Sequence, residues 1–148
     1  MLSDLLRRLS GKDETPLAAD DARLAVAALL VIAANADSSY QDVERAQIER
    51  ALADRYALTG EQAAKLRADG EAAADAAMDL YKFTALIKKT LPYEERAPIL
   101  DALWRVILSD ADREAHEETL MRRVTDLLGL DPRDNIEARR RAQAAFEP

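Results

Sequence analysis

The sequence predicts an all-α fold, and three features of its composition lead to that prediction. Alanine, leucine, glutamate and arginine are abundant among the 148 residues, and all four favour helices. The chain has only four glycines and five prolines, so few positions interrupt a helix. No run rich in valine, isoleucine, threonine and aromatic residues has the pattern of a strand. A chain of this length suits one domain with its own core.

The chain divides into a short N-terminal helix with a linker, residues 1–15, and a helical domain, residues 16–148. Leucines lie beside Arg7 and Arg8 in the first ten residues. This pattern suits either a short helix that docks on the core or a helix that lies on a membrane surface, and we prefer the first. Every residue of 24–34 is apolar. A helix that is apolar on all sides is buried on all sides, so we expect this one to be central.

The next two helices are predicted from their capping residues. Ser38 and Ser39 are expected to cap a helix that runs to about Tyr56, because their hydroxyls accept hydrogen bonds from first-turn N–H groups. Thr59 and Gln62 have the spacing of a capping box and open the following helix, which runs to about residue 74.

Apolar residues at helical spacing predict the helices of the second half. One set ends before Pro92: Leu80, Phe83, Ile87 and Leu91. Another marks the core face of a helix that begins near residue 94: Ile99, Leu100, Leu103, Trp104 and Ile107. Gly129 suits the end of the next helix and Pro132 the first position of the last one. About eight helices are expected in all.

Residues 24–58 and 97–130 repeat one plan, in which an apolar helix, an acidic corner and a second helix follow one another. Asp37 lies at the first corner, and Glu44 follows seven residues later. Asp110 lies at the second corner, and Glu117 follows at the same distance. We therefore expect two helical units related by a pseudo-twofold axis around two central helices.

Both glutamates are expected to point inward, because each shares a helix face with apolar residues four or more positions on. A buried carboxylate needs a backbone N–H group, a basic side chain or a metal ion as its partner. The second corner is the richer candidate for a divalent cation, with four carboxylates: Asp110, Asp112, Glu114 and Glu117. The first corner, with Asp37 and Glu44, is the poorer candidate. From the residues alone, helix capping and cation binding are equally supported.

The second corner differs from an EF-hand although its acids alternate as the first ligands of a calcium loop do. Ala115 stands where that loop needs glycine, and Met121 stands where it needs glutamate. His116 is the only histidine and the chain has no cysteine, which makes a transition-metal site a poor match.

Charge and composition exclude several classes of function. A net charge of −7 argues against a nucleic-acid surface, and we interpret Arg139–Arg141 as a solvated last turn that complements its helix dipole. The longest uncharged stretch is shorter than a membrane span, so no stable membrane insertion is expected. No catalytic motif is present, so we expect a non-enzymatic protein, and the cytoplasm is its expected location.

Several segments of the chain together resemble the tellurite-resistance protein B (TerB) family. They are the Ala36-Asp37 corner with Glu44, Asp79-Leu80-Tyr81-Lys82-Phe83-Thr84, Glu94-Glu95-Arg96, Leu103-Trp104-Arg105-Val106, the Asp110 corner, His116-Glu117-Glu118 and Arg122-Arg123. The resemblance covers roughly residues 20–142. It implies an all-helical domain of duplicated three-helix units, divalent-metal binding at the acidic positions and a link to tellurite or general stress responses. Ser38 and Ala111 stand where the family pattern has glycine.

The function expected from these observations is a non-catalytic TerB-like module that binds a divalent cation of the calcium or magnesium type. The alternative is a protein–protein interaction or scaffold module with no metal ligand, which would recruit an unidentified protein partner. A third hypothesis is a hydrolase that uses the carboxylates on a bound metal. The sequence does not indicate an oligomeric state.

Overall fold

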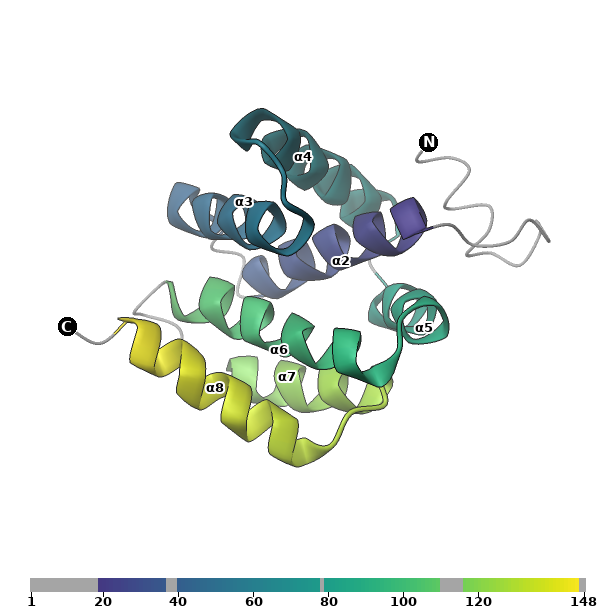
Figure 1. Cartoon of the computed structure of the whole chain (residues 1–148), viewed down its shortest axis with the longest axis vertical. Helices are drawn as coiled ribbons and strands as arrows, with labels where there is room; N and C mark the ends of the chain where they lie inside the picture. Colours follow the sequence, from purple (N-terminus) through teal and green to yellow (C-terminus); the bar gives the residue numbers. More distant parts are fainter. Residues whose placement is uncertain (1–18, 37–39, 78, 110–115, 147–148) are drawn as a thin grey trace.

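The computed structural model describes residues 19–36, 40–77, 79–109 and 116–146 (Figure 1). These residues form seven helices and no strand, which confirms the all-α prediction for the described part of the chain. The helices are α2 (Ala19–Ala34), α3 (Asp42–Tyr56), α4 (Gly60–Ala76), α5 (Leu80–Thr90), α6 (Tyr93–Leu108), α7 (His116–Leu127) and α8 (Pro132–Phe146). The helix expected within residues 1–15 lies outside the described residues.

Helix α2 is the centre of the fold, as its apolar sequence predicts. It packs against α3, α4, α5 and α6. Every side chain from Leu24 to Ala34 is buried, and the most exposed of them, Ile32, keeps only 8% of its surface. A helix without a polar face has no side to turn toward water, so its neighbours must cover it all round.

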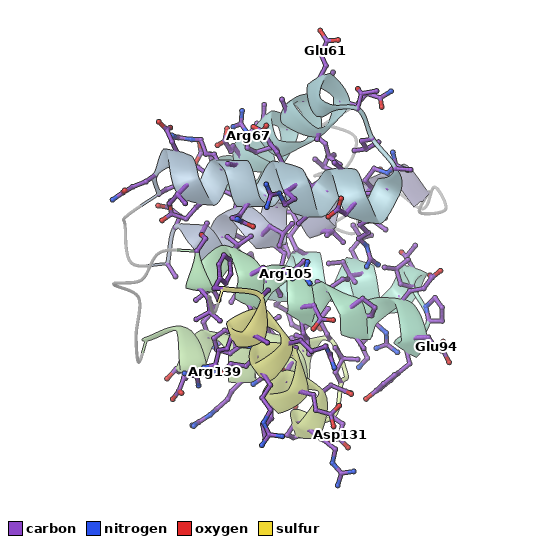
Figure 2. All side chains as sticks on the ribbon, turned by 60° about the vertical axis from the view of Figure 1, so that its left-hand side comes forward. Glu61, Arg67, Glu94, Arg105, Asp131 and Arg139 are labelled. Atoms are coloured by element: carbon purple, nitrogen blue, oxygen red, sulfur yellow. The ribbon has the colours of Figure 1, made fainter. Side chains whose placement is uncertain are left out.

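The second half packs around α6. Figure 1 shows α6 between α2 on one side and α7 and α8 on the other. The predicted core face is confirmed, since these five side chains are all buried: Ile99, Leu100, Leu103, Trp104 and Ile107. Glu61 and Glu94 are among the charged side chains that point outward, as Figure 2 shows.

Capping residues decide where several helices begin and end. The Thr59–Gln62 capping box is confirmed, with N–H to side-chain oxygen distances of 2.9 and 3.1 Å. Gly129 ends the α7 segment with a positive φ of 69°, a conformation that glycine adopts without strain.

The predicted cap of α3 is wrong. The N-cap residue is Gln41, and the capping box joins Gln41 to Glu44. Ser38 and Ser39 lie outside the described residues, before this N-cap. The helix begins later than the serines suggest because Glu44, three residues after Gln41, supplies an acceptor for the N-cap N–H group.

The helix ends that flank the two acidic corners lie on the same side of the molecule. The C-terminal ends of α2 and α6 and the N-terminal ends of α3 and α7 all lie at the left in Figure 1. The pseudo-twofold relation between the two halves stays a prediction. None of the described helices combines the length and apolar character that crossing a membrane requires.

Candidate functional site

Glu44 is the one predicted site residue whose side chain the structure describes. It lies in the first turn of α3 and is completely buried. The backbone N–H of Gln41 donates a hydrogen bond to Glu44 Oε2 at 3.1 Å. Ile48 and Leu52, four and eight residues on, are buried on the same face of the helix. The prediction that this glutamate points inward is therefore confirmed, and a backbone N–H group is one partner of its carboxylate.

The other predicted ligands are not described in enough detail to test a metal site. Asp37, Asp110, Asp112 and Glu114 lie outside the described residues. Glu117 belongs to α7, but its side chain is not described. Within the described ranges, no group of three or more His, Asp or Glu residues could hold a metal ion. Metal binding at the second corner, and at the first, stays a prediction.

A cavity of about 380 Å³ adjoins the first corner at the C-terminal end of α2. Asn35 and Ala36, the residues that lead into the corner, line it together with Asp79 and Arg123. Asp79 also caps α5 by accepting hydrogen bonds from two N–H groups of its first turn, at 3.0 and 3.4 Å. Sequence reasoning missed this cavity because its walls come from α2, α5 and α7, which are far apart along the chain.

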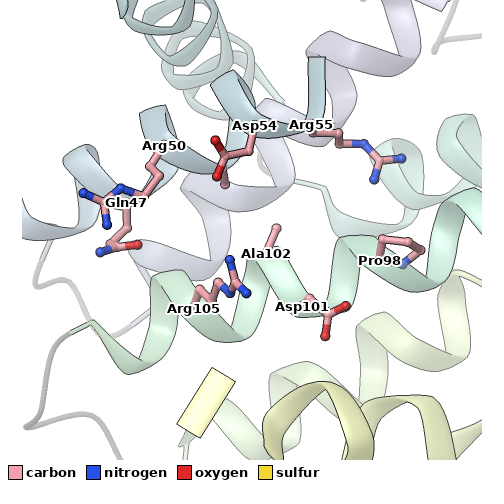
Figure 3. A pocket seen from close by; sticks show the side chains of 9 residues that line it. Gln47, Arg50, Asp54, Arg55, Pro98, Asp101, Ala102 and Arg105 are labelled. Atoms are coloured by element: carbon pink, nitrogen blue, oxygen red, sulfur yellow. The ribbon is translucent and has the colours of Figure 1, made fainter. Parts of the chain in front are cut away.

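A second cleft, of about 270 Å³, lies between α3 and α6 (Figure 3). Its lining carries charges of both signs: Arg50, Asp54, Arg55, Asp101 and Arg105. Two of these side chains are already bound elsewhere. Arg55 donates to the Glu95 carbonyl at 2.7 Å, and Asp101 accepts from Arg141 at 2.9 Å. None of its lining residues has a buried polar side-chain atom without a hydrogen-bond partner in the described structure, so no unmet group there indicates a ligand.

A polar network joins α3, α4 and Tyr40, which lies two residues before α3. Arg67 donates to Glu49 at 2.6 Å and to Glu71 at 2.8 Å, while the Tyr40 hydroxyl donates to Glu71 at 2.6 Å. Burial, and then the neighbouring Glu71 carboxylate, raise the pKa of Tyr40 well above its ordinary value. These contacts hold α4 against α3, and the carboxylates of the network are engaged by it.

A third cleft, of about 500 Å³, lies between α6, α7 and α8; we call it the α8 cleft. Trp104 of α6 forms part of its wall, and the indole N–H donates to Asn135 Oδ1 of α8 at 2.7 Å. Arg139 of α8 bonds to Glu118 of α7 and lies over the indole ring, 5.0 Å from its centroid. This arrangement lowers the pKa of Glu118, because the Arg139 guanidinium donates a hydrogen bond to its carboxylate.

The interpretation of Arg139–Arg141 as a solvated last turn is wrong. Helix α8 continues to Phe146, so the three arginines lie in its middle. Arg139 bonds to α7 through Glu118, and Arg141 donates to Asp101 of α6 at 2.9 Å. The pattern along the chain could not show this, because the partner residues on α7 and α6 lie 21 and 40 positions before these arginines.

Comparison with known proteins identifies the family. No significant match to a curated protein or to a solved structure was found. The model of one family, described as tellurite resistance protein TerB, matches residues 23–140, which span α2 to most of α8. That match covers most of the chain, and the all-helical fold agrees with it. The chain belongs to the TerB family.

Proposed function

We propose that this protein is a non-catalytic TerB module of the tellurite or metal stress response that binds a divalent cation of the calcium or magnesium type. The acidic corner between α6 and α7 is the binding site, with Asp110, Asp112, Glu114 and Glu117 as its ligands. The first corner, with Asp37 and Glu44, is a weaker second site. Carboxylate oxygens in this number suit hard cations, which prefer oxygen ligands.

The burial of Glu44 is the observation that best supports this proposal. Glu44 holds the same place in the first repeat as Glu117 holds in the second, seven residues after the corner aspartate. Its carboxylate is completely buried at the start of α3. A buried carboxylate needs partners, and the Gln41 N–H is one of those at Glu44. At the second corner we propose a cation as such a partner for Glu117. The second corner adds two further acids, Asp112 and Glu114, which the first corner lacks.

Isothermal titration calorimetry of the chelator-treated full chain with calcium, magnesium, manganese and zinc tests the proposal. Calcium or magnesium is expected to give saturable heat and to raise the thermal unfolding midpoint. Asp110→Asn and Glu117→Gln each remove one ligand charge. Each is expected to weaken binding by more than the roughly tenfold cost of a lost outer-shell partner.

Glu61→Gln is the matched control, because it removes one negative charge from the first turn of a helix away from both corners. Glu61 is exposed at the start of α4 and points away from the molecule in Figure 2. Its substitution is expected to leave the titration unchanged. Absence of heat and of a thermal shift up to millimolar metal would contradict the proposal. Equal weakening by Glu61→Gln would show that only net charge matters.

A further inference from the structure

The α8 cleft has the size and lining of a small-molecule site. Its volume of about 500 Å³ falls within the range of ligand pockets. Apolar side chains from α6, the α7–α8 connection and α8 line it: Trp104, Leu130, Pro132 and Ile136. Ile136 leaves 56% of its surface exposed and lines this cleft. An apolar ligand body would cover that surface.

The cleft also holds two guanidinium groups with unused hydrogen-bond donors. Arg122 is exposed in the lining and has no ion pair within 4 Å in the described part of the chain. Arg139 binds Glu118 through one terminal nitrogen, but its buried Nε has no hydrogen-bond partner in the described structure. Buried donors are nearly always paired, so an unpaired one beside a cleft indicates an acceptor that a ligand could supply.

Two carboxylates also line the cleft, and they affect how strongly it attracts an anionic ligand. Glu118 is bonded to Arg139, which offsets part of its charge, and it also interacts electrostatically with Arg122. Asp126 is exposed and stands four residues after Arg122 on α7, so it competes with any anion for that guanidinium. The attractive groups are thus Arg122 and Arg139, and the opposing groups are Asp126 and, to the extent that Arg139 does not offset its charge, Glu118.

We propose that the α8 cleft binds a small organic acid, with its apolar body against Trp104 and Ile136 and its carboxylate on Arg122. A guanidinium and a carboxylate pair through charge-assisted hydrogen bonds, which accounts for the acid group. The apolar walls account for the rest of the molecule. The site is separate from the proposed cation site, because it uses none of the corner acids.

The sole tryptophan of the chain makes this proposal directly measurable. Trp104 lies in the cleft wall, so tryptophan fluorescence of the full-length protein reports on this site alone. We would titrate the protein with octanoate below its micelle concentration, and in parallel with octanol and octylamine. Octanoate is expected to give a saturable change at much lower concentration than octanol or octylamine, since only the acid pairs with Arg122.

Variants on α7 separate ionic recognition from simple partitioning. Arg122→Gln is expected to weaken octanoate binding at least about tenfold, which corresponds to ~1.4 kcal/mol, and to leave octanol unaffected. Arg123→Gln is the matched control, because the neighbouring arginine lines the cavity at the end of α2 instead. Asp126→Asn is expected to strengthen octanoate binding, since it removes the competing carboxylate.

Three results would overturn the proposal. One is the absence of a saturable change with octanoate. Another is equal binding of octanoate, octanol and octylamine, which would show apolar partitioning without recognition of the acid. The third is equal weakening by Arg122→Gln and Arg123→Gln, which would place the anion outside the cleft. Both arginines are exposed, so neither substitution is expected to disturb folding, and circular dichroism checks that.

Discussion

Gly70 lies where α4 crosses α2, and its lack of a side chain sets how closely the two helices approach. A Cβ atom at this position would stand 2.8 Å from the Ala27 carbonyl carbon and 2.8 Å from the Ala27 Cβ. Ala27 belongs to the buried central helix α2, so its atoms cannot move aside as the end of a flexible side chain can. Small residues elsewhere on α4, such as Ala63 and Ala73, are buried too and permit the same close packing.

Gly70→Ala is therefore expected to lower the free energy of unfolding by about 1–3 kcal/mol, the usual cost of overpacking a core. Gly60→Ala is the control within the same helix, because a Cβ there meets no atom within 4 Å. It is expected to cause no loss of stability. Urea unfolding of both variants measures the difference. Equal stability of Gly70→Ala and the unchanged chain would show that α4 shifts freely on α2.

At the scale of elements, one hydrogen bond ties the start of α3 to α4. The Tyr40 hydroxyl donates to Glu71 Oε2 at 2.6 Å, and Arg45 lies over the Tyr40 ring, 4.6 Å from its centroid. Burial and the adjacent carboxylate raise the pKa of Tyr40, because both disfavour the phenolate. The folded protein therefore keeps the Tyr40 proton at a pH where the unfolded chain releases it.

This shift predicts a loss of stability at high pH. The contribution of Tyr40 is fully present below the ordinary tyrosine pKa of about 10, and it declines as the pH rises above that value. Tyr40→Phe is expected to be less stable than the unchanged chain near neutral pH, with a shallower decline above about pH 10. Thermal unfolding midpoints across this pH range give the comparison.

Tyr81→Phe serves as the control for this experiment. Tyr81 is 63% exposed on α5, and its ring hydroxyl makes no hydrogen bond to the described residues. Its substitution is expected to leave both the midpoint at neutral pH and its decline at high pH unchanged. Parallel declines for the unchanged chain and Tyr40→Phe would contradict a raised Tyr40 pKa.

At the scale of the whole molecule, α2 joins the earlier and the later helices of the fold. It contacts α3 and α4 in the first half of the chain, and α5 and α6 in the second. Helix α3 also contacts α6 directly. Because the apolar face of each half is completed by the other, neither half is expected to remain folded alone.

One cooperative unfolding transition is therefore expected. Far-ultraviolet circular dichroism reports the helices of both halves, whereas tryptophan fluorescence reports Trp104 on α6 alone. The two signals are expected to change at the same urea concentration, as two-state unfolding requires. Transitions that separate along the urea axis would show that the second half unfolds independently of the first.

Local patterns were enough to predict most of the elements. The all-apolar run from residue 24 predicts a central helix, since such a helix at the surface would expose apolar side chains to water. The Thr59–Gln62 spacing and Gly129 predict a helix start and a helix end, because caps act between residues close in sequence. The inward position of Glu44 follows from the spacing of Ile48 and Leu52 on the same face.

The errors lie where spacing left more than one choice open. Ser39 has the chemistry of a cap, but the helix begins after Gln41, where Glu44 can accept the N-cap N–H. The positive charges of Arg139–Arg141 suit the C-terminal end of a helix, but α8 continues to Phe146. Their partners are on α6 and α7, and no rule of spacing connects them to α8.

The sequence alone therefore determined the class of fold, the central helix and the repeated acidic corners, because periodicity and capping depend on neighbours along the chain. Only the tertiary structure decided which helices form the α8 cleft, that Arg139 reaches Glu118 and Trp104, and that the helix ends flanking both corners lie on the same side. These features depend on side chains brought together from distant segments, and packing alone selects which of them meet.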